Sequence, residues 1–251
     1  MITRGNNMIV AAMATMPERA PYLEHVVETI RPQVDLLKVY LNNFVKCPPF
    51  LEPDEVCFSD AAAGDLGDAG KFYWIDGRDG ANGYTHYATL DDDLAYPSDY
   101  IATLVKESNA RNGKAIIGVH CSIFSDPVVD YSLSRQERYT FYEPLSSAKP
   151  VNMLGTGTAL LGRKTLALSL ENDFLAIRNA ADLQLAIAAQ KQEVPMVAIA
   201  RPKKWITEIR PWNEKSFSIW QDVLRNGWQA ETALARTAIS AWRVYADPIS
   251  L

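Results

Sequence analysis

The sequence predicts an α/β protein in which strands and helices alternate along the chain. Apolar runs rich in β-branched residues are separated by stretches whose apolar residues recur at helical spacing. The chain has 251 residues, 48% of them hydrophobic, which is enough for a packed core in one large domain or two small ones. No internal repeat or low-complexity segment interrupts the pattern. We therefore expect a globular, sheet-based fold.

Eight apolar runs are the expected strands, and the helices lie between them. The runs are residues 8–14, 36–41, 55–59, 72–75, 85–90, 115–120, 158–162 and 195–200. The first run lacks a cleavage-site pattern and is too short to span a bilayer, so it is expected to be a strand whether Met1 or Met8 is the natural start. No later segment reaches the length of a transmembrane helix, so any membrane contact should be peripheral.

The clearest helix is expected directly after the fifth run. Ser98 is placed to cap it, and Gly113 lies beyond its end. Its apolar face would be formed by Tyr100, Ile101, Leu104 and Val105.

Charge and cysteine content exclude several classes of protein. The formal net charge is −5, and no basic stripe is present, so a nucleic-acid partner is not expected. Cys47, Cys57 and Cys121 are an odd number without metal-type spacing, which indicates neither a disulfide framework nor a zinc site. We expect a cytoplasmic protein, either free or at the inner face of the membrane.

Three consecutive aspartates, Asp91 to Asp93, follow the fifth apolar run. Open α/β sheets bind ligands beyond the carboxyl ends of their strands, and hard carboxylate oxygens suit Mg²⁺ or Mn²⁺. In extended geometry the side chains of Asp91 and Asp93 would project to the same side of the chain and could hold one cation together. The side chain of Asp92 would project to the other side. The alternative is that all three are turn residues leading into the following helix.

The segment ATLDDDLAYPSDY resembles the DXD region of GT-A glycosyltransferases, particularly bacterial enzymes similar to glycosyltransferase family 2. The opening VAAMATMPERAPYLEHVVETIRPQVDLLKVYLNNF and the segment DLGDAGKFYWID resemble other parts of that family, in the expected order. The resemblance covers roughly the first half of the chain. It implies one GT-A domain, with a Rossmann-like mixed sheet flanked by helices and a helical C-terminal tail. Residues 1–110 would bind the nucleotide sugar, 111–212 the acceptor, and 213–251 would form the tail.

The resemblance also implies a nucleotide-sugar site. Asp60 would accept a hydrogen bond from the base, and Pro17 and Arg19 would shape the loop beside the uracil or ribose. Asp68 and Lys71 would hold the ribose or pyrophosphate region, where a lysine is a suitable point charge. The donor would also contact Asp91 and Asp92, and Asp91 and Asp93 would hold Mn²⁺ or Mg²⁺. Each residue also has an ordinary interpretation as a turn, surface or helix-start residue.

An inverting transfer needs a base for the acceptor hydroxyl, and Asp182 resembles the aspartate on a late helix that serves this purpose. An aspartate in a first helical turn is also favoured by the helix dipole alone, and Asp173 is a nearby competitor. Gly155, Thr156 and Gly157 either let the backbone approach a sugar acceptor or form a simple tight turn. His120, at a strand end, either lines the crevice and ligates a metal or is a hydrogen-bonded structural residue, which is the favoured interpretation.

Five of the six tryptophans follow residue 200. Residues 201–216 mix aromatic and cationic side chains and are expected to form a mobile loop that closes over the substrates. Trp205 and Trp212 are the acceptor-binding candidates in it. The helical spacing of Trp220, Val223, Leu224 and Trp228 instead favours a tail helix packed on the core.

These observations favour a metal-dependent inverting glycosyltransferase that uses a nucleotide sugar, most simply a UDP-sugar, to extend a surface glycan. A sugar nucleotidyltransferase is the second candidate, but it should have a glycine-rich loop with a basic residue after the first strand, where this chain has ATMPERAP. A non-catalytic module that binds nucleotide sugars or glycans is the third. The intact aspartate triplet and the placed base argue against it.

Overall fold

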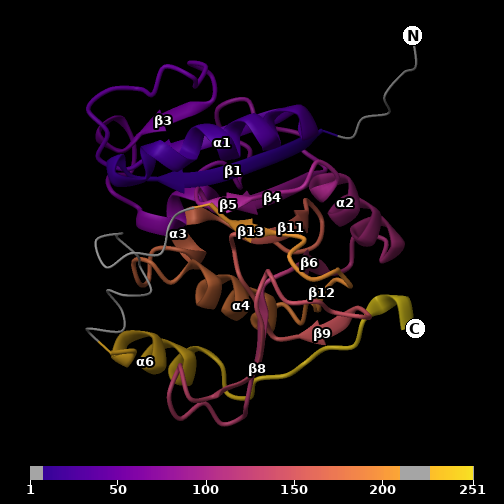
Figure 1. The fold of residues 1–251 in the computed structure, drawn as a ribbon. Helices are drawn as coiled ribbons and strands as arrows, with labels where there is room; N and C mark the ends of the chain where they lie inside the picture. The colour runs from indigo at the N-terminus through magenta and orange to yellow at the C-terminus, as the bar shows by residue number, and fades with distance from the viewer. Residues whose placement is uncertain (1–7, 210–226, 251) are drawn as a thin grey trace.

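The computed structural model describes residues 8–209 and 227–250 (Figure 1). It is a mixed α/β structure built on one eight-stranded sheet. In spatial order the strands are β3 (Val56–Phe58), β2 (Leu36–Leu41), β1 (Ile9–Thr15), β4 (His86–Leu90), β11 (Thr158–Gly162), β6 (Ile116–Gly118), β12 (Met196–Ala198) and β9 (Lys149–Val151). All run parallel except β11 and β9, which are antiparallel to their neighbours.

The sheet has a hydrophobic core on each face, because successive side chains of its central strands point to opposite sides. In β1, Val10 and Ala12 belong to one core, and Ala11 and Met13 belong to the other. The strand is therefore apolar along nearly its whole length, as its sequence IVAAMAT predicts.

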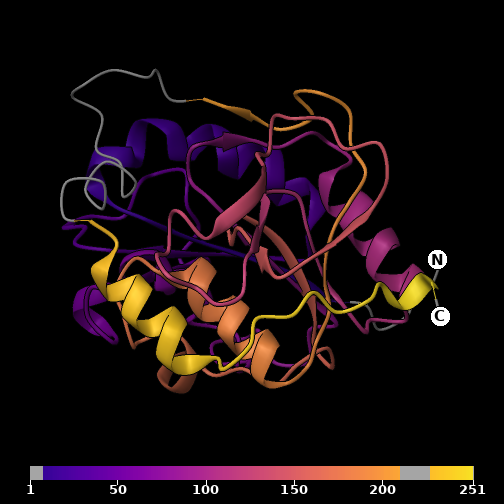
Figure 2. The same cartoon turned by 90° about the horizontal axis from the view of Figure 1, so that it is seen from below.

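Helices α1 (Ala20–Ile30) and α2 (Tyr100–Ala110) cover one face of the sheet. The apolar residues of α1 recur at helical spacing and are buried against the sheet: Leu23, Val26, Val27 and Ile30. The other face is covered by the 3₁₀ segment η4 (Gly67–Phe72) and by helices α3 (Leu170–Asp173) and α4 (Ala181–Lys191). Helix α4 is buried nearly all round because α6 (Gln229–Ala238) packs on its outer side (Figure 2).

Two small sheets lie beside the large one. The first has the order β10 (Met153–Leu154), β7 (Cys121–Phe124) and β8 (Arg135–Tyr139), and the second pairs β5 (Leu94–Ala95) with β13 (Thr207–Glu208). Sequence patterns missed all five strands and β9, because these strands are short and β8 is largely polar and exposed.

The predicted strands are confirmed in seven of eight cases, with two matching their bounds, 36–41 and 158–162. The prediction for residues 72–75 is wrong, because this segment ends η4 and continues as turns. Its aromatic residues are buried by packing and not by strand pairing. Phe72 stacks on Phe174 at 3.7 Å between ring centroids, and Trp74 packs edge-on against Tyr40.

The helix predicted after the aspartates is confirmed as α2, but Ser98 does not cap it. Asp99 is the N-cap residue and makes no side-chain cap hydrogen bond. Gln33 supplies the missing acceptor, because its Oε1 accepts a hydrogen bond from the Ile101 N–H. Gly113 lies past the helix end with φ of +66°, and its N–H donates to the Ser108 carbonyl.

The three cysteines are free. In the part of the chain that the structure describes, no helix is long and apolar enough to cross a membrane. Other 3₁₀ segments are η1 (Pro17–Arg19), η2 (Arg31–Gln33), η3 (Ser59–Ala61) and η5 (Pro248–Ser250).

The strand order reverses between β1 and β4. From β1 the chain moves outward through β2 to β3, and it then returns to the other side of β1 as β4. Parallel sheets form a crevice at such a reversal, just beyond the carboxyl ends of the two strands. The residues at this position are Met16 to Arg19 after β1 and Asp91 to Asp93 after β4.

The C-terminal segment is tied to the end of α2 by a buried ion pair. Arg111 is 2% exposed and donates from Nε and Nη2 to the two carboxylate oxygens of Asp247, at 2.8 and 2.6 Å. Its Nη1 donates to Glu107 at 2.7 Å. Removing the guanidinium would leave Asp247 as an uncompensated buried charge.

We therefore expect Arg111→Ala to lower the free energy of unfolding by about 3 kcal/mol. Urea denaturation followed by circular dichroism measures this loss. The matched control is Lys114→Ala, which removes an exposed cation three residues away and should change stability by less than about 0.5 kcal/mol. A loss below about 1 kcal/mol for Arg111→Ala would show that the ion pair does not anchor the C-terminal segment.

Candidate functional site

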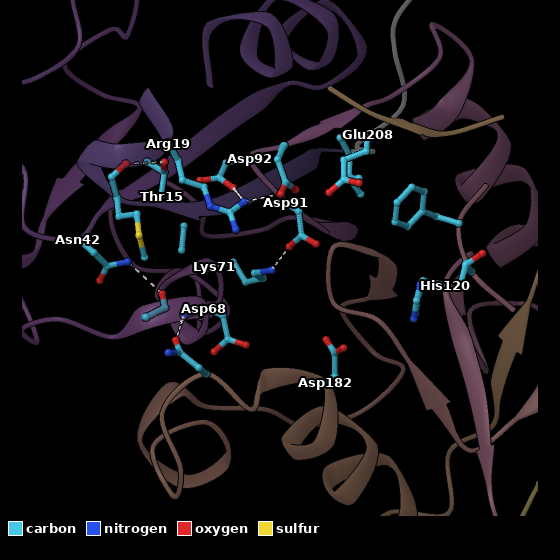
Figure 3. A pocket seen from close by; sticks show the side chains of 18 of the residues that line it. Thr15, Arg19, Asn42, Asp68, Lys71, Asp91, Asp92, His120, Asp182 and Glu208 are labelled. Atoms are coloured by element: carbon cyan, nitrogen blue, oxygen red, sulfur yellow. Dashed lines mark hydrogen bonds and ion pairs between the residues drawn. The ribbon is translucent and has the colours of Figure 1, made fainter. Parts of the chain in front are cut away.

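A cleft of about 850 Å³ lies at the reversal of strand order (Figure 3). Its walls come from the carboxyl ends of β1, β2 and β4, from η4, from the start of α4, and from the β6–β7 and β8 region. The residues that line it and that carry charge or donor groups are Thr15, Arg19, Asn42, Asp68, Lys71, Asp91, Asp92, Asp93, His120, Arg135, Arg138, Thr140, Tyr142, Asn179, Asp182 and Glu208.

The aspartate triplet is compensated by two cations from other segments. Lys71 Nζ lies 2.6 Å from Asp91 Oδ1. Arg19 Nη1 lies 2.9 Å from Asp92 Oδ1 and also pairs with Asp93 Oδ2. The ion pairs therefore group Asp92 with Asp93, and the predicted sharing of one metal ion by Asp91 and Asp93 stays a prediction. Strand β4 ends at Leu90, so the two-residue alternation does not extend into the triplet.

These ion pairs set the protonation of the triplet. Burial acts to raise the pKa of Asp91, but the charge and hydrogen bond of Lys71 outweigh it and hold this pKa below its ordinary value. Burial raises the pKa of Asp92 despite the nearby Arg19. The pKa of Lys71 is raised, because Asp91 and Asp68 outweigh the effect of its burial. Asp91 and Lys71 are thus charged at neutral pH.

Lys71 is 3% exposed, which rules out its interpretation as an ordinary surface lysine. The segment that carries it is held by Asn42, which follows β2 directly. Asn42 Nδ2 donates to the Gly67 carbonyl, and its Oδ1 accepts from the Leu66 N–H, both at 3.0 Å. The sequence reasoning missed Asn42, although a polar residue directly after a buried strand is the same signal that identified Asp91.

Asp68 connects η4 to the start of α4. Its Oδ2 accepts a hydrogen bond from the Ala181 N–H at 3.1 Å. Its Oδ1 is buried and has no hydrogen-bond partner among the described residues. Burial raises the pKa of Asp68 to about 6. The Asp68 side chain lines the cleft on the same side as Asp182 (Figure 3).

Asp182 lies in the first turn of α4, as predicted. Its Oδ1 accepts hydrogen bonds from both the N–H and the hydroxyl of Thr156, each at 2.7 Å. Within the described residues its Oδ2 makes no hydrogen bond, and the carboxylate points into the cleft (Figure 3). The competitor Asp173 does not line the cleft. It accepts a hydrogen bond from the Ser169 N–H at 2.8 Å and so helps to begin α3.

The segment Gly155–Thr156–Gly157 positions the residues of one wall and is not itself among those that line the cleft. Thr156 holds Asp182. A Cβ at Gly157 would lie 1.9 Å from Asp91 Oδ2, and a Cβ at Gly155 would lie 3.1 Å from the His120 side chain. The glycines therefore make room for pocket side chains, and the expected contact of this backbone with an acceptor stays a prediction.

His120 lines the cleft at the end opposite Asn42 and Thr15 (Figure 3). Burial lowers its pKa, although the carboxylate of Asp182 acts in the opposite direction. In the described part of the chain its ring nitrogens have no hydrogen-bond partner, so a hydrogen-bonded structural role is not supported. The ring packs beside Phe141 at 6.2 Å between centroids.

Three further predicted site residues lie outside the cleft lining. Asp60 is exposed in η3, and Pro17 lies in η1, two residues before Arg19. Trp205 packs against Tyr100 of α2 at 5.6 Å between ring centroids. It therefore belongs to the hydrophobic core between α2 and the sheet. Trp212 lies outside the described residues, as do Trp220, Val223 and Leu224.

The described part of the expected loop, residues 201–209, is joined to the rest of the fold by hydrogen bonds and strand pairing, and its mobility stays a prediction. Arg201 is buried and donates to the carbonyls of Glu143, Ile199 and Thr140. The following β13 pairs with β5, and the Ile209 N–H donates to the Asp93 carbonyl at 2.9 Å. This pairing brings Glu208 to the cleft, a residue that sequence reasoning missed because its position depends on a contact between distant segments.

No protein-family model matches this chain, and a search of curated proteins finds no match. Among solved structures, A197 from STIV is similar to this chain with a TM-score of 0.43 and 12% sequence identity. The similarity covers 82% of this chain and 85% of A197.

The raised pKa of Asp68 predicts a pH-dependent stability. In the folded protein this carboxyl binds its proton up to about pH 6, against an ordinary value of 3.8. The folded state therefore holds more protons than the unfolded state between these values, so stability decreases as pH rises through this window. Compared with Asp68→Asn, the wild type should lose up to about 3 kcal/mol of unfolding free energy between about pH 4 and about pH 7.

Urea denaturation of both proteins across this pH range tests the expectation. The asparagine keeps the size of the side chain and an oxygen for the Ala181 N–H. Parallel stability curves for the two proteins would show that Asp68 titrates as it does in the unfolded chain.

Proposed function

We propose that this chain is a metal-dependent, inverting glycosyltransferase of the GT-A type that uses a nucleotide sugar, most simply a UDP-sugar. One observation carries the proposal: Asp182, anchored by Thr156, faces the Asp91–Asp93 triplet across the cleft at the reversal of strand order. A sugar bound between them would have a carboxylate base on one side and, on the other, the carboxylates that are proposed to hold the metal ion. The mixed sheet with helices on both faces also supports the GT-A resemblance.

The donor nucleotide is proposed to occupy the end of the cleft formed by Thr15, Arg19, Asn42 and Asp68. Here the carboxylate Oδ1 of Asp68 offers a buried acceptor for a ribose hydroxyl. Arg19 and Lys71 supply positive charge where the diphosphate would lie. Pro17 would act through the loop that carries Arg19. Asp60 is the least supported donor contact, because it is exposed outside the cleft lining.

Asp91 and Asp93 would hold Mn²⁺ or Mg²⁺ in this proposal. Their carboxylate oxygens are the hard ligands that these ions prefer, and the Asp91 side chain is 44% exposed to the cleft. Among the described residues, no three His, Cys, Asp or Glu side chains are grouped to hold a metal. Water and diphosphate oxygens would therefore complete the coordination. The ion would neutralise charge that develops on the leaving nucleoside diphosphate.

Asp182 is the proposed general base. Its free Oδ2 would accept the proton of the acceptor hydroxyl while the hydroxyl oxygen forms a bond to the anomeric carbon. The bond from that carbon to the diphosphate oxygen breaks on the opposite side, so the configuration inverts. Thr156 fixes the carboxylate through Oδ1, which leaves Oδ2 aimed at the cleft. Lys71 orients Asp91 through its 2.6 Å ion pair.

The two alternatives have weaker support. The loop after β1 contains no glycine, whereas a nucleotidyltransferase needs a glycine-rich phosphate loop at this position. A non-catalytic binding module would not need a carboxylate that is fixed by hydrogen bonds from both the N–H and the hydroxyl of one threonine. The proposed acceptor is a glycan of a bacterial surface polysaccharide, reached in the cytoplasm or at the inner face of the membrane.

The metal part of the proposal predicts that UDP binds more tightly with Mn²⁺ than with EDTA, by about tenfold or more, because the ion would offset the negative charge of both the carboxylates and the diphosphate. Asp93→Ala should remove this difference. Isothermal titration calorimetry measures both affinities. Asp54→Ala, which removes an exposed aspartate outside the cleft, is the matched control and should bind as the wild type does. Equal wild-type affinities in Mn²⁺ and EDTA would contradict a metal-dependent site.

The catalytic part predicts that Asp182→Asn keeps donor affinity and loses turnover. The amide oxygen can still accept from Thr156, but the side chain cannot take a proton. UDP release from the sugar nucleotide that stabilises the protein most in a thermal-shift screen should fall by roughly two to four orders of magnitude. Asp173→Asn is the control and should turn over normally.

An equal loss of donor affinity in Asp182→Asn would make Asp182 a binding residue. Normal turnover would exclude it as the base.

A further inference from the structure

Two arginines of β8, Arg135 and Arg138, line the end of the cleft that adjoins His120. Strand β8 pairs with β7, which begins directly after His120. The two arginines therefore lie on the far side of Asp182 from the proposed nucleotide end. Neither residue has a role in the donor site proposed above.

A β-bulge places both arginines on the same face of β8. Ser122 of β7 pairs with Arg138 of β8, and Phe124 pairs with Arg135. The single β7 residue between Ser122 and Phe124 therefore lies opposite two residues of β8. Ser122 and Phe124 are two residues apart and share a face, and their partners share it too. The hydrogen bond from Arg135 Nε to Ser122 Oγ, at 3.0 Å, agrees with this arrangement. Without the bulge, residues three apart would face opposite sides.

The two arginines have no acidic partner among the described residues, unlike Arg19 and Lys71 in the same cleft. Glu137, which lies between them in sequence, instead pairs with Lys149. Desolvation and the adjacent positive charge of Arg135 lower the pKa of Arg138. Two like charges held together in a cleft are stabilised when an anion binds between them.

Arg135 is also held in an orientation that suits anion binding. Its Nε is engaged by Ser122, and its guanidinium packs over the Tyr131 ring at 5.6 Å. Its two terminal nitrogens make no hydrogen bond to any described residue. A planar guanidinium fixed at Nε presents these nitrogens as a fork that matches the two oxygens of a carboxylate or phosphate.

We propose that Arg135 and Arg138 form a subsite for an anionic group, carboxylate or phosphate, on the acceptor sugar. This inference rests on the proposed function and specifies its acceptor class. The acceptor would bind with its anionic group on β8 and its reactive hydroxyl toward Asp182, while the donor diphosphate occupies the other end of the cleft.

Three sugars that differ only at C6 test the subsite: neutral methyl glucoside, methyl glucuronide and methyl glucoside 6-phosphate. Ligand-observed NMR measures their dissociation constants for the full chain, with and without saturating UDP and Mn²⁺. At least one anionic sugar should bind roughly tenfold more tightly than the neutral one, the effect of one charge-assisted hydrogen bond or more. The better of the two anionic probes identifies the group as carboxylate or phosphate.

Variants assign the preference to β8. Arg135→Gln should abolish the preference for the anionic sugar, and Arg135→Lys, which keeps the charge but loses the fork, should reduce it. Arg236→Gln removes an exposed cation on α6 outside the cleft and should keep the full preference. Arg135→Lys also covers the case in which the glutamine variant fails to fold.

Equal affinities for the three sugars, or an unchanged preference in both Arg135 variants, would overturn the inference. Displacement of the anionic sugar by UDP would also overturn it, because it would place Arg135 on the donor diphosphate. Normal UDP binding with no anion preference contradicts the subsite alone. An anion preference without any UDP binding contradicts the proposed function and leaves an anion site on β8.

Discussion

Compensation of three adjacent carboxylates at the end of a buried strand is the constraint on which the cleft depends. Asp91 to Asp93 would repel one another in a partly desolvated site, so cations must be brought to them. Arg19 comes from the segment after β1, and Lys71 comes from η4, which Asn42 fixes to the end of β2. The ion pairs therefore join three segments around the reversal of strand order. The same contacts that relieve the repulsion assemble the wall of the cleft.

The opposite wall depends on the Gly155–Thr156–Gly157 segment before β11. One residue of this segment holds Asp182, and its two glycines leave space for Asp91 and His120. Tyr96 adds a further link, because its hydroxyl accepts from the Asp91 N–H at 2.8 Å and donates to the Gly157 carbonyl at 2.6 Å. The acid on α4 and the acids after β4 are thus positioned by one short segment. A shift of its backbone would move both carboxylates of the proposed reaction together.

The sequence predicted the strands that are buried on both faces and the residues at their ends. Periodicity identifies β1, β2, β4 and β11 because most of their residues are apolar, and its position after β4 then brings Asp91 to attention. Asp182 is suggested instead by the family resemblance, because it lies in a helix and not at the end of a strand. Sequence could not predict Glu208 or the arginines of β8. Their positions depend on a pairing between β5 and β13 and on a bulge, both of which follow from tertiary contacts. The pattern in 72–75 misled for a related reason, because aromatic packing against Phe174 and Tyr40 produced an apolar run without a strand.

The distribution of charge along the cleft is consistent with a donor at one end and an acceptor at the other. Arg19 and Lys71 already pair with the triplet, so in the proposed donor complex these cations would turn toward the diphosphate oxygens while the carboxylates hold a divalent cation. In such an exchange the two charges of a divalent cation would replace those of Arg19 and Lys71 at the carboxylates. Arg135 and Arg138 offer no comparable exchange, because no described carboxylate holds them. Arg138 donates to the carbonyls of Ser132 and Arg135, whereas the terminal nitrogens of Arg135 make no hydrogen bond to a described residue. Arg135 is therefore the member of the pair that is most open to an anionic group of a ligand.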